Sequence, residues 1–172
     1  MIGVIADDFT GAAEIGAVGL RHGLRAEVLL DGHPTQKIDL VCIDTDSRSC
    51  LPDEAARRTA VAANLLASCG VDWIYKKVDS VLRGPVTAEI RAINKELGLS
   101  RALLIPANPS LGRTIQNGCY FIRGKPLHET EFARDPEYPR TSARVHDLLG
   151  ATETSPIAVC SAEDTQIGRA HV

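Results

Sequence analysis

The chain opens with Met1-Ile-Gly-Val-Ile-Ala6, a short apolar run that stops at two adjacent carboxylates, Asp7 and Asp8. A run of this kind, ending in turn chemistry, is typical of a strand buried on both faces of a parallel sheet. A helical pattern follows, and we expect Thr10 to cap it because its hydroxyl can accept a first-turn amide. In open α/β sheets, ligands bind outside the carboxyl ends of the strands, so the acidic pair marks a candidate site.

The helix expected after the acidic pair has a face of small residues that includes Ala12, Gly16 and Gly19. Glycines weaken a helix, but they let it approach a sheet closely. The pattern ends at His22 followed by Gly23, which is a typical helix C-terminus. We therefore interpret His22 as a helix-end residue and not as a catalytic one.

Strand and helix patterns then alternate along the chain, which predicts right-handed crossovers and a mostly parallel sheet. The expected fold is α/β: an open, doubly wound sheet with helices on both faces, followed by a C-terminal hairpin and a long loop. The strands are expected at residues 25–30, 40–43, 72–75, 102–105 and 157–160, and the helices at 52–70 and 86–97. Ser142 could cap a further, short helix that runs through Leu149. The hairpin is expected to turn at Arg123-Gly124, and the loop to cover residues 130–141.

Composition narrows the class of protein. The 172 residues, of which 44% are hydrophobic, suffice for one globular domain with a core, and the net charge of −3 argues against nucleic acid as a partner. Neither a membrane-spanning run nor a secretory signal is present, so no membrane partner is expected. The five cysteines are scattered without C-x-x-C pairing, which excludes a zinc site and suits a cytoplasmic protein. Cys42 and Cys160 lie in apolar runs and are expected to be buried thiols.

A second polar cluster follows the strand expected at 72–75. It contains Lys76, Lys77, Asp79, Ser80 and Arg83 within eight positions. An arginine fork fits a carboxylate or phosphate, lysine adds a point charge, and serine and aspartate suit the hydroxyls of a polyol. The same cluster is also compatible with an ordinary solvated loop.

A third polar segment follows the strand expected at 102–105. Two prolines and Gly112 make this loop rigid, so Asn108 and Arg113 could face the same crevice as the other two clusters. This segment is weak evidence when taken alone, because Asn-Pro is an ordinary turn signal.

Taken together, these segments resemble the N-terminal domain of the four-carbon acid sugar kinases, which phosphorylate threonate, erythronate or 3-oxo-tetronate with ATP. The resemblance is collinear from Met1 to about Leu149. It rests on four motifs in order: Ala6-Asp-Asp-Phe-Thr-Gly-Ala12, Lys76-Lys-Val-Asp-Ser-Val-Leu-Arg-Gly84, Pro106-Ala-Asn-Pro through Gly112-Arg113, and Pro126-Leu-His-Glu-Thr-Glu-Phe-Ala-Arg-Asp135.

The resemblance implies that this domain binds the sugar acid. Lys76 and Arg83 are the candidates to bind its carboxylate, and Ser80 and Asn108 the candidates for its hydroxyls. Asp8 or Asp79 would act on the hydroxyl that is phosphorylated. Asp7 and Arg113 complete the predicted substrate-binding set, and no metal ligands are assigned.

The family's ATP and Mg²⁺ belong to a C-terminal nucleotide-binding domain that is absent from this sequence, so we expect the chain to need no cofactor and to be inactive alone. Residues 1–166 would be the substrate-binding domain. Residues 167–172 (Ile-Gly-Arg-Ala-His-Val) match the translation of a common sequencing-library adaptor, ATC GGA AGA GCA CAC GTC followed by TGA. We interpret them as a non-native tail, against the alternative of a natural disordered terminus.

Two alternatives remain open. A phosphorylation-controlled receiver domain is also doubly wound and has paired acids after its first strand, and Asp44 could mimic its phosphorylated aspartate. Such a domain needs a lysine at the end of its fifth strand, where this chain has Ile105-Pro106. The other alternative is a non-catalytic sugar-acid-binding module. The sequence does not indicate which tetronate is preferred, and it is compatible with an oligomer.

Overall fold

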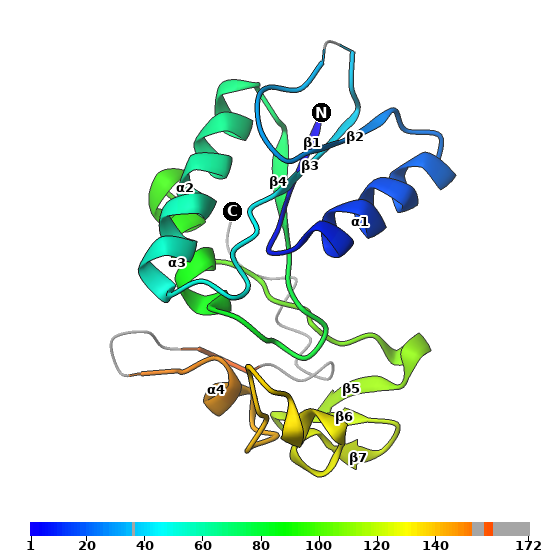
Figure 1. The fold of residues 1–172 in the computed structure, drawn as a ribbon, viewed down its shortest axis with the longest axis vertical. Coiled ribbons are helices and arrows are strands. Elements are labelled where there is room, and N and C mark those ends of the chain that lie inside the picture. The colour runs from blue at the N-terminus through cyan, green and yellow to red at the C-terminus, as the bar shows by residue number, and fades with distance from the viewer. Residues whose placement is uncertain (36, 153–156, 160–172) are drawn as a thin grey trace. The chain divides into compact units, whose positions relative to one another are not determined.

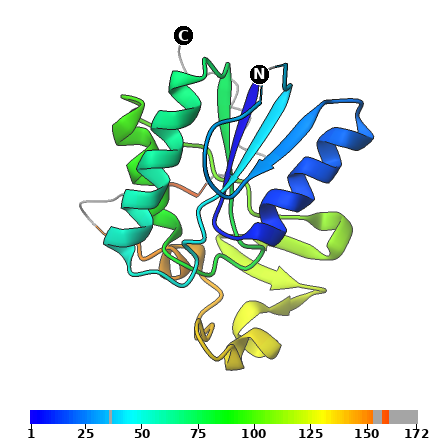
Figure 2. The ribbon, with the colours of Figure 1, turned by 45° about the horizontal axis from the view of Figure 1, so that its top comes forward.

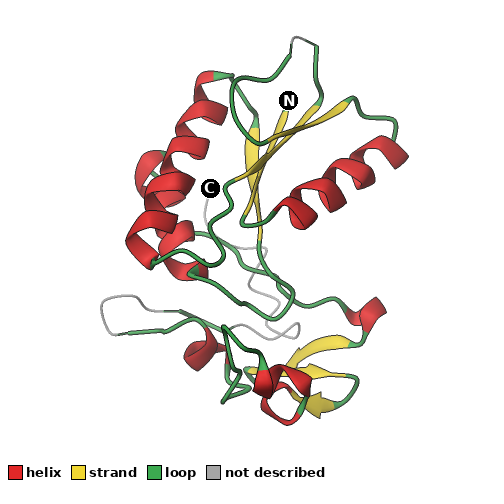
Figure 3. Ribbon diagram, viewed as in Figure 1, coloured by secondary structure: helices red, strands yellow, loops and turns green. Residues whose placement is uncertain are grey.

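The computed structural model describes residues 1–35, 37–152 and 157–159 (Figure 1). The chain divides into two compact units, Met1–Pro106 and Ala107–Val172. Within the described residues, the first unit holds a four-stranded sheet and the second a three-stranded sheet (Figure 3). In this part of the chain, no helix is long and apolar enough to cross a membrane.

The first unit is built on a parallel sheet with the strand order β2-β3-β1-β4. All three strand pairs are parallel, which confirms the predicted α/β fold. In register, Ala6 at the end of β1 lies opposite Asp44 on one side and Lys77 on the other, so the carboxyl ends of three strands meet. The strands are β1 (Ile2–Ala6), β2 (Ala26–Leu29), β3 (Leu40–Asp44) and β4 (Trp73–Lys77).

Helices cover both faces of this sheet, as Figure 2 shows. α1 (Phe9–Arg21) packs on one face, where Ala12 joins a buried cluster with Val4 and Cys42. α2 (Pro52–Ser68) and α3 (Val86–Glu96) pack on the other face. There, Leu66 and Ile93 join the cluster that is formed by the alternate strand residues, such as Ile5, Val41 and Ile43. Because side chains alternate along each strand, each face of the sheet contributes to a separate core.

The small-residue face of α1 does bring the helix close to the sheet. A Cβ atom placed on Gly19 would lie 2.3 Å from Cδ2 of Leu40, which leaves no room for a side chain. One placed on Gly16 would lie 3.2 Å from Cγ2 of Val28, a tight but tolerable contact. Cys42, on the strand beneath, is buried as a free thiol, as predicted.

Of the two predictions for the ends of α1, the one for the N-terminus is wrong and the one for the C-terminus is correct. Asp8, not Thr10, is the N-cap, because its extended backbone lets Oδ1 accept a hydrogen bond of 2.8 Å from the Gly11 amide. At the other end His22 is the C-cap and Gly23 follows with φ 78°, as expected.

The strand expected at residues 102–105 does not form. These residues have no strand assignment, and Leu103 and Ile105 are 74% and 72% exposed. An apolar run becomes a strand only where it can pair with a neighbouring strand and pack into a core. The sequence of the run itself specifies neither contact. In the described chain the sheet of the first unit ends at β4.

The second unit is a meander of three antiparallel strands, β5 (Arg113–Gln116), β6 (Cys119–Ile122) and β7 (Lys125–Pro126). The predicted turn at Arg123-Gly124 joins β6 to β7, and both of its residues have positive φ. β5 was not predicted; it pairs with β6 through a second turn of the same kind at Asn117-Gly118. Asn-Gly is the strongest short hairpin signal, so the sequence did contain the information. Three short 3₁₀ turns accompany these strands: η1 (Pro109–Leu111), η2 (Leu127–Glu129) and η3 (Glu131–Arg134).

Of the two predictions for the end of the chain, one is confirmed in part and one is wrong. The expected short helix is present as one turn, α4 (Val145–Leu148), with Leu149 as its C-cap. Its N-cap is Arg144 and not Ser142, whose hydroxyl accepts a hydrogen bond of 3.0 Å from the Arg144 amide. Residues 157–159 form no strand, although the Ile157 carbonyl oxygen lies 2.7 Å from Nε2 of His146. Cys160 and the tail 167–172 lie outside the described residues.

Candidate functional site

The candidate site begins at the carboxyl end of β1. Asp7 is buried, with its side chain 2% exposed, whereas the side chain of Asp8 is 27% exposed. Asp8 is oriented by the Gly11 amide at Oδ1. Oδ1 of Asp7 is buried and has no hydrogen-bond partner among the described residues. Nearby, burial raises the pKa of Asp44, a hydrogen bond from the Asp46 amide opposes that rise, and the surrounding carboxylates add to it.

A residue that was not predicted, Arg48, lies between the carboxylates. It comes from the loop after β3, and its Nε lies 2.7 Å from Oδ2 of Asp7. Its Nη1 lies 2.9 Å from Oδ2 of Asp8 and 3.8 Å from Oδ1 of Asp79. Burial lowers the pKa of Arg48, but the three carboxylates outweigh this effect and raise it. The sequence signal for Arg48 is a polar cluster directly after a strand, like the clusters after β1 and β4.

The loop after β4 is organised around Asp79. Arg83 donates to this carboxylate from Nε at 3.0 Å and from Nη2 at 2.8 Å, and the amides of Val81 and Arg83 donate as well. Burial by itself raises the pKa of Asp79, whose side chain is 4% exposed, but these hydrogen bonds lower it to about 2. The carboxylate is therefore ionised at neutral pH, and Ser80 is fixed between the bonded residues.

The two adjacent lysines belong to β4 itself and not to the loop after it. Because side chains alternate along a strand, they point to opposite faces of the sheet. Lys76 bonds Glu89 of α3 at 3.0 Å, and Lys77 reaches Glu14 of α1 at 3.3 Å. The side chain of Lys76 is only 9% exposed. Its charge is thus engaged with a buried partner.

Glu89 connects Lys76 to a buried hydroxyl pair. Ser47 donates to Oε1 of Glu89, and the Ser47 and Thr45 hydroxyl oxygens lie 2.7 Å apart. The Thr45 hydroxyl in turn donates to the Ala6 carbonyl oxygen at 2.8 Å. This network fixes the loop after β3 to the end of β1 and to α3, and so sets the backbone position from which Arg48 extends.

The remaining two predicted site residues lie in the second unit. Asn108 and Arg113 form an isolated antiparallel bridge, with backbone hydrogen bonds of 2.9 and 3.0 Å. Oδ1 of Asn108 accepts a hydrogen bond from Ser110. The structure thus brings Asp7, Asp8, Asp79 and Arg83 together in the first unit, places Ser80 in the same loop as Asp79, and joins Asn108 to Arg113 in the second.

The described residues do not fit a nucleotide or its magnesium ion. A helix N-terminus binds phosphate through free first-turn amides, but at α1 the Gly11 amide is bound by Asp8. α2 and α3 begin at Pro52 and after Pro85, without a glycine-rich loop before either. Within the described chain, no group of three or more His, Cys, Asp or Glu side chains has the arrangement of a metal site.

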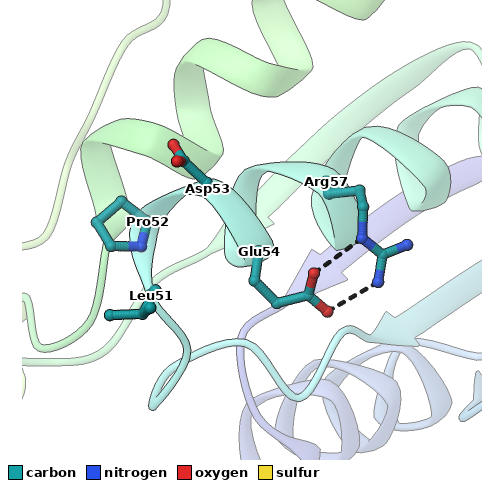
Figure 4. A pocket seen from close by; sticks show the side chains of 5 residues that line it. All are labelled: Leu51, Pro52, Asp53, Glu54 and Arg57. Atoms are coloured by element: carbon teal, nitrogen blue, oxygen red, sulfur yellow. Dashed lines mark hydrogen bonds and ion pairs between the residues drawn. The ribbon is translucent and has the colours of Figure 1, made fainter.

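The surface has two hollows that are lined by other residues than the predicted site residues. The larger, of about 510 Å³, is at the start of α2 and is shown in Figure 4. Asp53, Glu54 and Arg57 are its charged lining residues, and Arg57 donates two hydrogen bonds of 2.8 Å to Glu54. The other, of about 270 Å³, lies beside the ends of β2 and β3 and includes Asp44 and Thr45. Neither hollow is lined by a predicted site residue.

Comparison with known proteins assigns the family. The family model described as the sugar-binding N-terminal domain matches residues 2–172. The chain belongs to this family. The D-threonate kinase of Salmonella typhimurium is 36% identical over 170 residues, which cover 96% of this chain and 40% of the kinase. The D-erythronate kinase of Heliobacterium modesticaldum is 36% identical over 154 residues, covering 86% of this chain and 35% of that kinase. Other relatives are 3-oxo-tetronate kinases.

The fold of this sugar-binding domain also matches a solved structure. A protein from Bordetella bronchiseptica, crystallised as a domain-swapped dimer with bound citrate, superposes with a TM-score of 0.80 at 33% identity. The match covers 87% of this chain and 39% of that protein. The predicted resemblance is thereby confirmed, and the receiver-domain alternative is set aside. The sugar-binding domain spans about two fifths of the length of the relatives that it matches.

Proposed function

We propose that this domain binds a four-carbon sugar acid at the carboxyl ends of β1 and β4 and presents its terminal hydroxyl for phosphorylation. The observation that carries the proposal is the state of Asp8. Its carboxylate is fixed at both oxygens, by the Gly11 amide and by Arg48, yet remains partly exposed. A fixed, accessible carboxylate can accept a hydrogen bond from a substrate hydroxyl and orient that oxygen.

Arg83 is the candidate that binds the sugar carboxylate. Its side chain is 28% exposed, and Asp79 holds it in one orientation. Lys76 would have to leave Glu89 to bind the sugar acid directly, so we assign it a weaker role. Ser80, in the same loop, is the candidate to bind a sugar hydroxyl. We assign Asp79 a positioning role, because it holds Arg83 in one orientation. The sequence-based predictions for Asn108 and Arg113, which lie in the second unit, stay predictions.

The phosphate donor would bind elsewhere. We infer that ATP and Mg²⁺ are held by the part of the longer relatives that this domain does not span, because the described residues offer neither a phosphate cradle nor a metal site. Phosphoryl transfer depends mostly on positioning and charge neutralisation, so a domain that binds the acceptor alone would not catalyse it. The domain-swapped dimer of the Bordetella protein supports an oligomer as the working form.

Binding measurements test this proposal. The purified chain is titrated with the D and L forms of threonate and erythronate by calorimetry, and its melting temperature is followed with the same acids. Threitol, which lacks the carboxylate, is the control. We expect at least one acid to bind saturably and to raise the melting temperature, because a ligand that binds only the folded state stabilises it. If all four acids behave like threitol, the proposal is wrong.

A further inference from the structure

We propose that Arg48 is a positioning residue of this site, which fixes Asp8 for the substrate through its bonds to the carboxylates around it. The expected effect on substrate binding rests on the proposed function. The effect on the structure around Asp8 can be measured without any ligand. Arg48 comes from a third loop, after β3, whereas the acids that it contacts follow β1 and β4. It is thus the link among three loops that meet at one edge of the sheet.

The backbone of Arg48 is fixed before its side chain makes any contact. The amides of Ser47 and Arg48 both donate to the Asp7 carbonyl oxygen, at 3.0 and 3.2 Å. On the other side Gly84, with φ 83°, packs against Arg48, since a Cβ there would lie 3.0 Å from the Arg48 carbonyl oxygen. The guanidinium therefore projects from an anchored position, and little conformational freedom remains to be lost when it binds the acids.

Charge explains why an arginine is needed at this position. Asp7, Asp8 and Asp79 contribute three negative charges, and Arg83 forms an ion pair with Asp79. Asp7 and Asp8 are adjacent in the chain, and Asp7 is buried, so without Arg48 they would repel each other in a poorly solvated place. A single guanidinium can bond both, because its nitrogens present donors in different directions.

The consequence for Asp8 is specific. Its Oδ1 accepts from Gly11 and its Oδ2 from Arg48, so the loss of Arg48 leaves the carboxylate fixed at one oxygen only. The Asp8 carboxylate would then rotate or turn away from Asp7, and the Gly11 amide would no longer have a hydrogen-bond acceptor in a fixed position. This predicts weaker substrate binding together with a local loosening of the first turn of α1.

The test compares Arg48→Gln, Arg48→Lys and the control Arg25→Gln. Arg25 donates two hydrogen bonds of 2.8 Å to a single carboxylate, that of Asp39, ahead of β2 and β3 at the other end of the sheet. Amide hydrogen exchange is measured at Gly11, with Leu24 as the reference amide because it bonds the Gly19 carbonyl oxygen at the far end of α1. Sugar-acid affinity is measured by calorimetry on the same samples.

We expect exchange at Gly11 to become about tenfold faster in Arg48→Gln and affinity to fall by about tenfold or more, as for the loss of a hydrogen bond to a charged group. Arg48→Lys should recover part of both, because it restores the charge, and Arg25→Gln should change neither. Mere loss of packing would not be recovered by restoring a charge. Exchange at Leu24 should stay unchanged throughout.

The outcomes separate the two proposals. Unchanged exchange at Gly11 in a folded Arg48→Gln protein overturns the positioning role, whether or not the chain binds sugar acids. Faster exchange without any binding by the wild type supports the structural role of Arg48 and refutes the proposed function. If Arg48→Gln does not fold, Arg48→Lys decides: wild-type exchange and wild-type affinity in that variant would overturn the role.

Discussion

The guanidinium of Arg83 binds the carboxylate of Asp79, four residues earlier in the same loop, through hydrogen bonds of 3.0 and 2.8 Å. The amides of Val81 and Arg83 bind the same carboxylate, so the loop after β4 closes on one buried acid. The fully buried Leu82 lies inside this loop with φ 62°, a conformation that the surrounding bonds must hold. The relationship leads to a prediction on stability and another on binding.

The first prediction concerns acid stability. The folded-state pKa of Asp79 is lowered from 3.8 to about 2, so its ionisation stabilises the fold above about pH 4, and this contribution is lost as pH falls towards 2. The shift corresponds to about 2 kcal/mol. In Asp79→Asn the contribution is absent at every pH. The difference in unfolding free energy between wild type and variant should therefore narrow by about 2 kcal/mol between pH 4 and pH 2.

Denaturant unfolding across that range measures this difference. Glu54, whose pKa is lowered to about 2 by Arg57 and Arg58, titrates in the same window, but it is present in both proteins and cancels. Parallel stability curves for wild type and Asp79→Asn would show that Asp79 is not the group responsible.

The second prediction concerns binding of the sugar acid. Arg83→Ala should weaken it by about 1.5–3 kcal/mol, the range for a hydrogen bond to a charged group, if Arg83 binds the substrate carboxylate. Arg25→Ala, which removes the exposed ion pair with Asp39, is the matched control and should leave affinity unchanged. Calorimetry with the best-binding tetronate gives both values. Equal affinities in the two variants would remove Arg83 from the site.

The third prediction concerns the contact between α1 and the sheet. Gly19→Ala should destabilise the domain by about 1–3 kcal/mol, because its Cβ would lie 2.3 Å from Leu40 in a packed core. Gly16→Ala meets Val28 only at 3.2 Å, and there the higher helix propensity of alanine offsets the strain. Thermal unfolding of the pair should therefore show Gly19→Ala as clearly the less stable. The reverse order would contradict the packing described here.

The fourth prediction concerns turnover. A polypeptide of this sequence should show no sugar-acid-dependent hydrolysis or transfer of phosphate from ATP, even where calorimetry detects binding of the acid. The reason is that, on the proposed division of roles, the phosphate donor is bound by the part of the longer relatives that this chain does not span. A coupled assay with ATP, Mg²⁺ and each tetronate measures this, and a threonate or erythronate kinase serves as the positive control. Substrate-dependent turnover by the chain alone would refute the division of roles.

The fifth prediction concerns residues 167–172, which lie outside the described residues. If they come from adaptor sequence, genomic DNA from an independent preparation should lack the codons ATC GGA AGA GCA CAC GTC and the stop TGA after the codon for Gln166. The reading frame should instead continue into a glycine-rich nucleotide domain. Amplification and sequencing of the locus decides this, and recovery of the same codons would establish the tail as natural.

Most of the secondary structure of the first unit could be predicted from the sequence alone. The apolar run ending at Asp7 and Asp8, the glycines at positions 23, 70 and 98 and the helical spacing between them predicted the strands and helices, because each signal acts within a few residues. The same signals placed the acidic pair and the cluster around Asp79 at strand ends. They wrongly placed the cap at Thr10 instead of Asp8, since either side chain can accept a first-turn amide.

Only the tertiary structure decided which charges meet. Arg48 is far in sequence from Asp7 and Asp8, and parallel pairing of β1 with β3 brings them within hydrogen-bonding distance. The separation of Lys76 from Lys77 onto opposite faces likewise follows from where β4 ends, and in the described part of the chain residues 102–105 pair with no strand. Sequence patterns report the preferences of neighbouring residues, whereas ion pairs across loops and strand pairing depend on contacts that only the folded chain creates.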